Sequence, residues 1–179
     1  MPQSHATPST TTRRAPARAR STSTKTRAKP ADAIALLKAD HAEVKKLFEA
    51  YDRLHKDEAS AGQRQELAQQ ICRMLEVHAT IEEELLYPAA REALGEPDLI
   101  DEAEVEHASA KALIAELKSM QPDEPMYDAK VKVLGEYVTH HVKEEEKEMF
   151  PKLRKQKMDL KAVGLMLAQR KDELESPME

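Results

Sequence analysis

The sequence of 179 residues has one cysteine, no tryptophan, four glycines and only six aromatic residues. The single cysteine, Cys72, excludes an intrachain disulfide and suits a reducing compartment, so we expect a cytoplasmic protein. Few glycines beside abundant Ala, Leu, Glu and Lys favour helix over strand. No apolar run approaches the about 20 residues that a membrane-spanning helix needs, so we expect no membrane partner. These absences together predict an all-α fold.

Acidic residues are absent from the first part of the chain. Residues 1–29 hold seven Lys and Arg and no acid, and they lack large apolar residues beyond Met1. Since the net charge is −5, the remaining residues carry about −12. Such a segment has too little apolar surface to offset chain entropy, so we expect a disordered basic tail over residues 1–29. It resembles neither a secretory signal nor an amphipathic transit peptide. Its function is solubilisation or nonspecific contact with nucleic acid or an acidic partner.

What the sequence does contain is apolar residues at helical spacing, in five segments. Ser60 and Gln63 form the pattern of a capping box, Pro88 should end or kink a helix, and Gly95-Glu96-Pro97 is a stop followed by a start. We predict an up-down antiparallel four-helix bundle over residues 30–157. An extra amphipathic helix within residues 158–179 could cap the bundle or meet a partner. The first expected helix runs from about residues 30–32 to 56, and the second from the capping box that begins at residue 60 to about 87. The others cover about residues 98–119, 126–149 and 159–174.

Histidine and glutamate interrupt these apolar stripes in a repeated pattern. The stretch from His78 to Pro88 aligns with the stretch from His141 to Pro151, and each reads His-x-x-x-Glu followed by an aromatic residue and proline. Residues four apart share one helix face, so each copy places an imidazole beside a carboxylate. The carboxylates are Glu82 and Glu145.

A second repeat supplies two further histidines. Asp40-His41-Ala42 is similar to Glu106-His107-Ala108, so the first and second helix pairs form two similar hairpins. At about 1.5 Å rise per residue, all four histidines lie roughly 19 to 24 Å from the nearest turn between paired helices. In an antiparallel bundle the four histidines therefore lie at the same depth along the bundle axis. Facing hairpins would enclose one site with approximate two-fold symmetry.

A lone histidine on an apolar face is usually a core residue whose hydrogen bonds are satisfied. Four histidines and two glutamates at one depth need another explanation. Burying unpartnered carboxylates costs several kcal/mol each, and a metal site removes that cost. Mixed His and carboxylate ligands suit Fe, Mn or Zn, and this number of ligands suffices for two octahedral ions, each with two His, if both carboxylates bridge. The candidate metal ligands are His41, His78, Glu82, His107, His141 and Glu145.

Neighbouring polar residues have other expected roles. His140 points about 100° away from His141, so it is a rim group or an alternative ligand. Lys45 and Lys111 each follow a candidate histidine by four residues, where they could reach the rim or neutralise a carboxylate. The remaining acids are expected on a solvated charged face: Glu83, Glu84, Glu144 and Glu146.

Over about residues 31–157 the sequence resembles the hemerythrin-like HHE cation-binding family. The resemblance rests on the His…His-x-x-x-Glu…His…His-x-x-x-Glu pattern and on the endings Glu82-Glu83…Tyr87-Pro88 and Glu145-Glu146…Phe150-Pro151. It implies a four-helix bundle with a non-haem di-iron centre of two iron ions. It also implies roles in binding or sensing O₂, peroxide or NO, or in iron handling.

One departure from the family pattern bears on function. The O₂ carriers of the family have a second histidine where this sequence has Lys111, which disfavours simple reversible O₂ carriage. We therefore predict a di-iron protein that binds or senses a small diatomic or peroxide ligand. The alternatives are a catalase-like or NO-reducing enzyme, an iron buffer, and an interaction scaffold with a vestigial site. The sequence leaves the oligomeric state open.

Overall fold

The computed structural model describes residues 32–176, and the predicted disordered tail lies outside these residues. Every regular element of the described part is helical. Among residues 32–176, no helix combines the length and the apolar character needed to cross a membrane. The elements are α1 (Ala33–Lys56), α2 (Ala61–Ile81), η1 (Glu82–Leu86), α3 (Tyr87–Leu94), α4 (Pro97–Ser119), α5 (Tyr127–Glu144), η2 (Glu145–Met149), α6 (Phe150–Lys155) and α7 (Leu160–Glu175).

Side-chain caps fix the starts of the first two helices. Asp32 precedes α1 and accepts a hydrogen bond of 2.8 Å from the Ala35 N–H. At the start of α2, the Gln63 N–H donates to Ser60 Oγ, and the Ser60 N–H donates to the Gln63 side chain. This reciprocal arrangement is the predicted capping box, and it satisfies donors that the first helical turn leaves open. The prediction for the start of α2 is confirmed.

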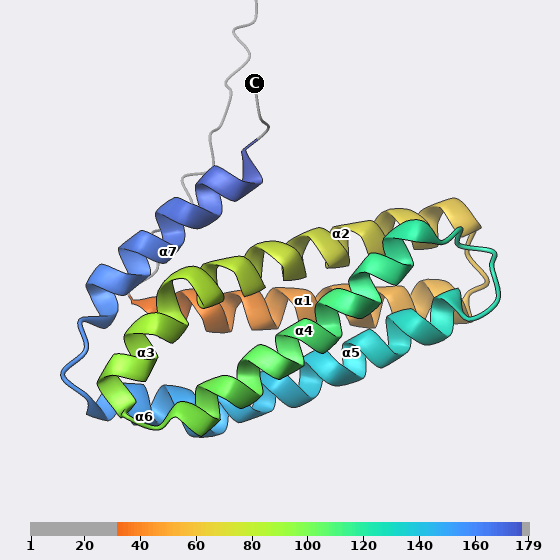
Figure 1. Cartoon of the computed structure of the whole chain (residues 1–179). Helices are drawn as coiled ribbons and strands as arrows, with labels where there is room; N and C mark the ends of the chain where they lie inside the picture. The colour runs from red at the N-terminus through yellow and green to blue at the C-terminus, as the bar shows by residue number, and fades with distance from the viewer. Residues whose placement is uncertain (1–31, 177–179) are drawn as a thin grey trace, which may run out of the picture.

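Pro88 kinks its helix but does not end it. The segment η1 is a π-helical turn, in which the Tyr87 N–H donates to the Glu82 carbonyl five residues earlier. Helix α3 then continues to Leu94, with the proline in its first turn, where a missing N–H is tolerated. Figure 1 shows α3 bending away from the line of α2. Of the two outcomes expected at Pro88, the kink is confirmed and the helix end near Tyr87 is not, because the π turn absorbs the break that proline imposes.

The same device recurs in the second hairpin. The π turn η2 lies between α5 and α6, and there the Phe150 N–H donates to the Glu145 carbonyl. The helix expected to end near Met149 continues to Lys155. Each π turn begins at the glutamate of a His-x-x-x-Glu pair. Both backbone distortions therefore coincide with candidate ligands, and π turns are frequent at functional sites.

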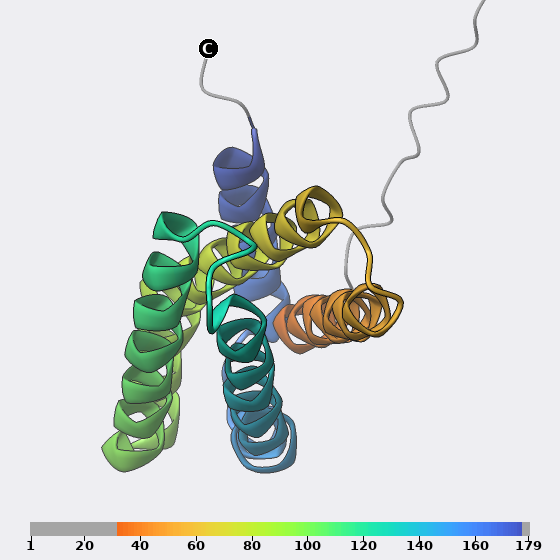
Figure 2. The same cartoon turned by 90° about the vertical axis from the view of Figure 1, so that its right-hand side faces the viewer.

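Four helical rods form the bundle, and the predicted fold is confirmed. The rods are α1, α2 with η1 and α3, α4, and α5 with η2 and α6. Figure 2 views these rods from the right-hand side of Figure 1, with α4 and α5 side by side and α1 seen nearly end-on. Two apolar clusters of buried residues fill its interior: one includes Ile34, Leu86 and Leu153, and the other includes Tyr51, Ile71 and Leu134.

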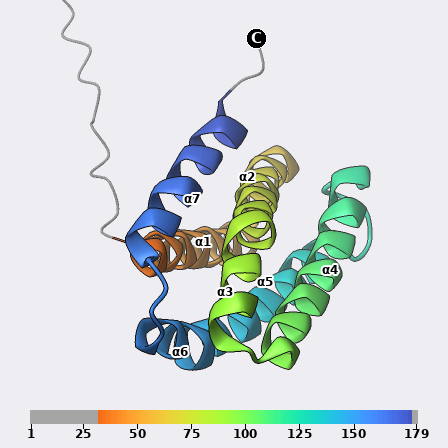
Figure 3. The same cartoon turned by 60° about the vertical axis from the view of Figure 1, so that its left-hand side comes forward.

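Helix α7 caps one side of the bundle, as one of the two sequence-based alternatives expected. It packs against α1, α2 and η1 and lies away from α4 and α5 (Figure 3). Its close approach depends on Gly164, where a Cβ would lie 2.6 Å from the Ala33 backbone nitrogen. Lys171 of α7 is buried and donates to Asp40 of α1 at 2.6 Å. Helix α7 therefore adds a positive charge near the candidate site.

Candidate metal centre

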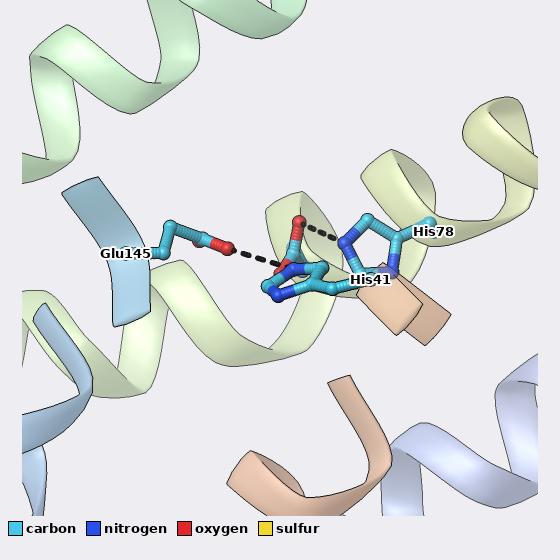
Figure 4. A group of neighbouring side chains, drawn as sticks. His41, His78 and Glu145 are labelled. Atoms are coloured by element: carbon cyan, nitrogen blue, oxygen red, sulfur yellow. Dashed lines mark ion pairs between the residues drawn. The ribbon is translucent and has the colours of Figure 1, made fainter. Parts of the chain in front are cut away.

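The six predicted ligand residues converge in the interior of the bundle. We call them the inner cluster: His41 from α1, His78 from α2, Glu82 from η1, His107 from α4, His141 from α5 and Glu145 from η2. All six are buried, and the two carboxylates are 0% and 1% exposed. Figure 4 shows His41, His78 and Glu145 pointing toward one another. The repeated spacing in the sequence thus places all six side chains at one depth.

The inner cluster divides into two groups that share one carboxylate. In the first group, His41 Nε2 lies 3.3 Å from a Glu145 oxygen, and His78 Nε2 lies 3.3 Å from a Glu82 oxygen. In the second group, His107 Nε2 lies 3.4 Å from the same Glu82 oxygen and 3.1 Å from His141 Nε2. Glu82 belongs to both groups. This arrangement suits two ion positions linked by the Glu82 carboxylate.

The other ring nitrogen of each histidine faces a second carboxylate, which comes from a different helix. These outer carboxylates are Asp40 on His78, Glu83 on His107, Glu106 on His141 and Glu146 on His41, at 3.5, 3.0, 2.7 and 3.0 Å. A carboxylate can only accept a hydrogen bond, so it favours the histidine tautomer with the proton on Nδ1. The Nε2 lone pair is then directed into the cluster. Three outer carboxylates are within hydrogen-bond distance and so orient His41, His107 and His141 toward a metal position. The contact of Asp40 with His78, at 3.5 Å, is a longer ionic one.

Two of these acids were placed wrongly by the sequence. Glu83 and Glu146 were expected on a solvated face, but both are half-buried and hold histidines. Lys111 neutralises a carboxylate, as one alternative expected, and contacts Glu83 at 2.6 Å. Glu84 is exposed and contacts Arg170. A helix-by-helix reading missed the outer carboxylates because each finds its histidine on another helix.

The burial of each side chain decides between His140 and His141 and places Lys45 and Glu144. His141 is buried in the cluster, whereas the side chain of His140 is 59% exposed and lies at the rim. Lys45 is exposed on α1, and Glu144 is half-buried beside His140 at 3.1 Å. The structure therefore brings His141 and not His140 into the inner cluster, as the repeat register predicts.

Tyr87 is a polar neighbour of the centre that sequence reasoning did not identify. Its hydroxyl lies 3.2 Å from Glu145 Oε1 and 3.2 Å from His107 Nε2, and the residue is fully buried. The aligned position in the other half is Phe150, which stacks on His41 with ring centroids 5.9 Å apart. The aligned aromatic residues were visible in the sequence. Only the structure shows that one half has a hydroxyl where the other has an apolar ring.

The pKa values of the two buried carboxyls, Glu82 and Glu145, shift in opposite directions in the metal-free protein. Burial, together with the charge of Glu145, raises the pKa of Glu82 to about 7. Burial acts on Glu145 as well, but its close contact with His41, at 3.3 Å, and the surrounding imidazoles hold its pKa well below the usual range. Burial alone would lower the pKa of His41, yet contact with Glu145 raises it to about 9. Two protons therefore remain in the cluster under conditions where free side chains would lose them.

The donor set fits metal ions better than it fits a hydrogen-bonded core. Several buried polar atoms make no hydrogen bond within residues 32–176: His41 Nε2, His78 Nε2, both Glu82 oxygens and Glu145 Oε2. A buried polar group without a partner is costly, and these atoms all face one another. Imidazole nitrogen and carboxylate oxygen are ligands of Fe, Mn and Zn. The unsatisfied atoms thus have the type, number and direction that a metal centre requires.

Comparison with known proteins assigns the family. Residues 32–153 match the hemerythrin HHE cation binding domain, which is more than half of the chain. The chain belongs to the hemerythrin HHE family. Domains of this hemerythrin type bind metal cations, and the inner cluster supplies His and Glu groups that could hold them.

Two relatives extend the comparison for this hemerythrin-like chain. It is 32% identical over 119 residues to a DNA nickase from Nostoc sp., a match that covers 66% of the chain and 32% of the nickase. The chain thus spans about a third of that relative. Its fold is similar to the crystal structure of a hemerythrin HHE cation-binding-domain protein from Mycobacterium kansasii. The TM-score is 0.65 at 25% identity, covering 80% of this chain and 86% of the other.

The raised pKa values predict that the metal-free hemerythrin-like domain loses stability as pH rises. A group whose pKa is higher in the folded state stabilises the fold below its unfolded pKa, and this contribution is lost as pH rises through the folded pKa. The loss spans about pH 4.5 to 7 for Glu82 and 6.5 to 9 for His41. We expect the free energy of unfolding, measured with urea after chelation, to fall by up to about 3 kcal/mol for each group.

A matched variant tests the origin of this pH dependence. Glu82→Gln should flatten the curve between about pH 5 and 7, because the amide does not titrate there. The fall between about pH 7 and 9 should persist, since His41 remains. A wild-type curve that stays level or rises over the whole interval contradicts the assignment.

Proposed function

We propose that the inner cluster binds two iron ions and, at this centre, a small diatomic or peroxide ligand: O₂, NO or H₂O₂. The first ion would be held by His41, His78, Glu82 and Glu145, and the second by Glu82, His107 and His141, with Glu82 as the bridge. Both groups have their donor atoms within 4.8 Å of one another. Bound iron supplies one-electron redox change and open coordination positions.

The observation that carries the proposal is a small cavity beside the four imidazoles. Its volume is about 40 Å³, room for only a few water molecules. All four cluster histidines line one part of it, and apolar side chains line much of the rest, among them Val44, Leu75, Ile114 and Val138. A cavity of this size and character suits a small, weakly polar ligand. It is too small for an organic substrate.

The chain's own residues have distinct tasks in this proposal. The outer carboxylates keep the imidazoles in one tautomer and one orientation. The apolar clusters exclude water, which strengthens every charge interaction inside the site. The Tyr87 hydroxyl is positioned to donate a hydrogen bond to Glu145, at 3.2 Å. Lys111 occupies the position of an imidazole in O₂ carriers and instead neutralises Glu83. This favours sensing or redox reaction over reversible carriage.

Tyr87 also favours a second candidate, an enzyme that consumes peroxide or NO. Burial and the nearby glutamates raise the pKa of the Tyr87 hydroxyl well above its usual range, so the proton stays on the oxygen beside the centre. Because it keeps its proton, the hydroxyl can donate a hydrogen bond to a ligand at the centre and stabilise the charge that develops there during reduction. The nicking of DNA belongs to the Nostoc relative, two thirds of which lies outside the match, and is not proposed for this chain.

The test combines metal analysis with absorbance spectroscopy. We expect about two irons per chain and a visible band that changes on reduction and returns when air is admitted. Irreversible oxidation with turnover of peroxide or NO would favour the enzyme, and that turnover should vanish in His78→Ala. His55→Ala is the control, because His55 is exposed at the end of α1. A folded protein that acquires no stoichiometric iron would contradict the proposal.

A further inference from the structure

Helix α5 and the first residue of η2 carry two His-x-x-x-Glu pairs side by side. His141 and Glu145 belong to the inner cluster, while His140 and Glu144 have the same spacing one residue earlier. Consecutive helical residues point about 100° apart, so the second pair faces outward from the bundle. His140 Nε2 lies 3.1 Å from Glu144 Oε1. The surface of α5 thus repeats the donor types of the buried centre.

Glu106 of α4 completes this outer group and connects it to the inner cluster. One Glu106 oxygen lies 3.4 Å from His140 Nε2, and the other accepts from His141 Nδ1 at 2.7 Å. We call Glu106, His140 and Glu144 the rim triad, whose ligand atoms all lie within 4.8 Å of one another. Glu106 and Glu144 are half-buried, and Glu106 also lines the cavity beside the four histidines. One carboxylate therefore touches both the rim and a candidate ligand.

The other half of the bundle has no equivalent group. By the repeat register, Val77 and Ile81 stand where His140 and Glu144 stand in the second half. Asp40, the counterpart of Glu106, is contacted at 2.6 Å by Lys171 of α7. Ile81 shares a buried apolar cluster with Leu167, also from α7. One side of the centre is thus closed by a helix and a positive charge, and the opposite side has an uncovered His and two carboxylates.

We propose that the rim triad is a third metal site, which takes a divalent first-row cation such as Fe²⁺ from solvent and passes it to the inner cluster. The delivery step rests on the proposed function of that cluster. One imidazole and two carboxylates bind such a cation and leave positions for water, so binding is readily reversible. Transfer needs no redox change: water and rim ligands leave the ion, and inner-cluster ligands replace them. The negative charge of Glu106 and Glu144 concentrates cations on this side.

The first experiment counts sites in the full chain. Protein is loaded with iron, washed with chelator and analysed for inner iron, and Mn²⁺ is then added and followed by electron paramagnetic resonance. We expect the iron-loaded wild type to bind one Mn²⁺ with a dissociation constant below about 1 mM. The double variant His140→Ala/Glu144→Gln should retain its iron and bind no Mn²⁺. His55→Ala is the matched control, since that exposed histidine also faces a carboxylate, Asp128, at 3.5 Å.

The second experiment measures delivery. Metal-free protein is mixed anaerobically with limiting Fe²⁺, and loading is followed by the fraction that resists a chelator. We expect the double variant to load about tenfold more slowly than wild type or His55→Ala, with the same final iron content. Circular dichroism of each variant establishes that the bundle is intact.

The outcomes separate the two proposals. Absence of Mn²⁺ binding in wild type, or unchanged binding in the double variant, overturns the rim site. Loss of Mn²⁺ binding with an unchanged loading rate overturns delivery. An iron content near zero overturns the proposed function and with it the delivery step, whereas one bound Mn²⁺ that the double variant abolishes would still support the rim site.

Discussion

Glu82→Gln will remove most of the metal from both ion positions. The carboxylate is fully buried and is shared by the two donor groups, so its replacement by a neutral amide weakens both at once. Loss of a hydrogen-bond partner of a ligand usually costs about 10- to 100-fold in metal affinity, and loss of a bridging ligand should exceed that. We expect metal content per chain, measured by mass spectrometry after a chelator wash, to fall from about two to a small fraction.

Glu84→Gln is the matched control for this substitution. Glu84 lies two residues further along the same π turn, but its side chain is exposed and contacts Arg170. Its variant should keep wild-type metal content. Equal retention in both variants would show that Glu82 does not bridge two ions.

A stability measurement separates this loss from simple misfolding. The metal-free Glu82→Gln variant should be more stable than metal-free wild type above about pH 7, because a buried carboxyl with a raised pKa opposes folding once ionised. Misfolding predicts the opposite change. The variant would thus lose metal while its metal-free bundle gains stability.

Gly164→Ala will detach or displace α7. The new methyl group would lie 2.6 Å from the Ala33 nitrogen and 2.7 Å from the Asp32 carbonyl carbon, and neither is a side-chain atom that can turn away. Overpacking of this kind typically costs about 1–3 kcal/mol. Displacement would also expose the buried contact between Lys171 and Asp40. We expect a lower free energy of unfolding and faster hydrogen exchange in α7.

Gly62→Ala provides the opposite expectation at a comparable helical position. A Cβ at Gly62 meets nothing within 4 Å, and the residue lies in the first turn of α2. Removal of glycine from a helix stabilises it by roughly 0.5–1 kcal/mol. If the two alanine variants had the same stability, the close packing of α7 on α1 would not describe the protein in solution.

The sequence predicted the parts of this fold that depend on local rules. Apolar periodicity located the helices, and the Ser60 capping box located the start of α2. The repeat register brought His41 and His141 to one depth, because matched helix lengths determine level positions in an antiparallel bundle. The sequence left open whether Pro88 ends or kinks its helix, and the structure shows the kink. A π turn supplies the bond that α-helical geometry lacks there, and no periodicity of 3.6 residues contains that information.

The outer carboxylates show a different limit. Asp40 precedes His41 and Glu106 precedes His107, so the sequence repeats an acid at each place. Their function appears only when helices pack, since Asp40 then lies 3.5 Å from His78 and Glu106 accepts from His141 at 2.7 Å. Tyr87 was hidden for the same reason. Residues that act on a neighbouring helix carry no signal in the helix to which they belong.

The difference between Tyr87 and Phe150 has a consequence for the reduction potentials of the two proposed ion positions. The approximate two-fold repeat would make the two ions interchangeable, but a hydroxyl lies by His107 and an apolar ring lies on His41. A hydrogen-bond donor and an apolar surface shift an ion's reduction potential in different ways. The two ion positions of the proposed centre would therefore differ in reduction potential, and Tyr87→Phe would reduce that difference.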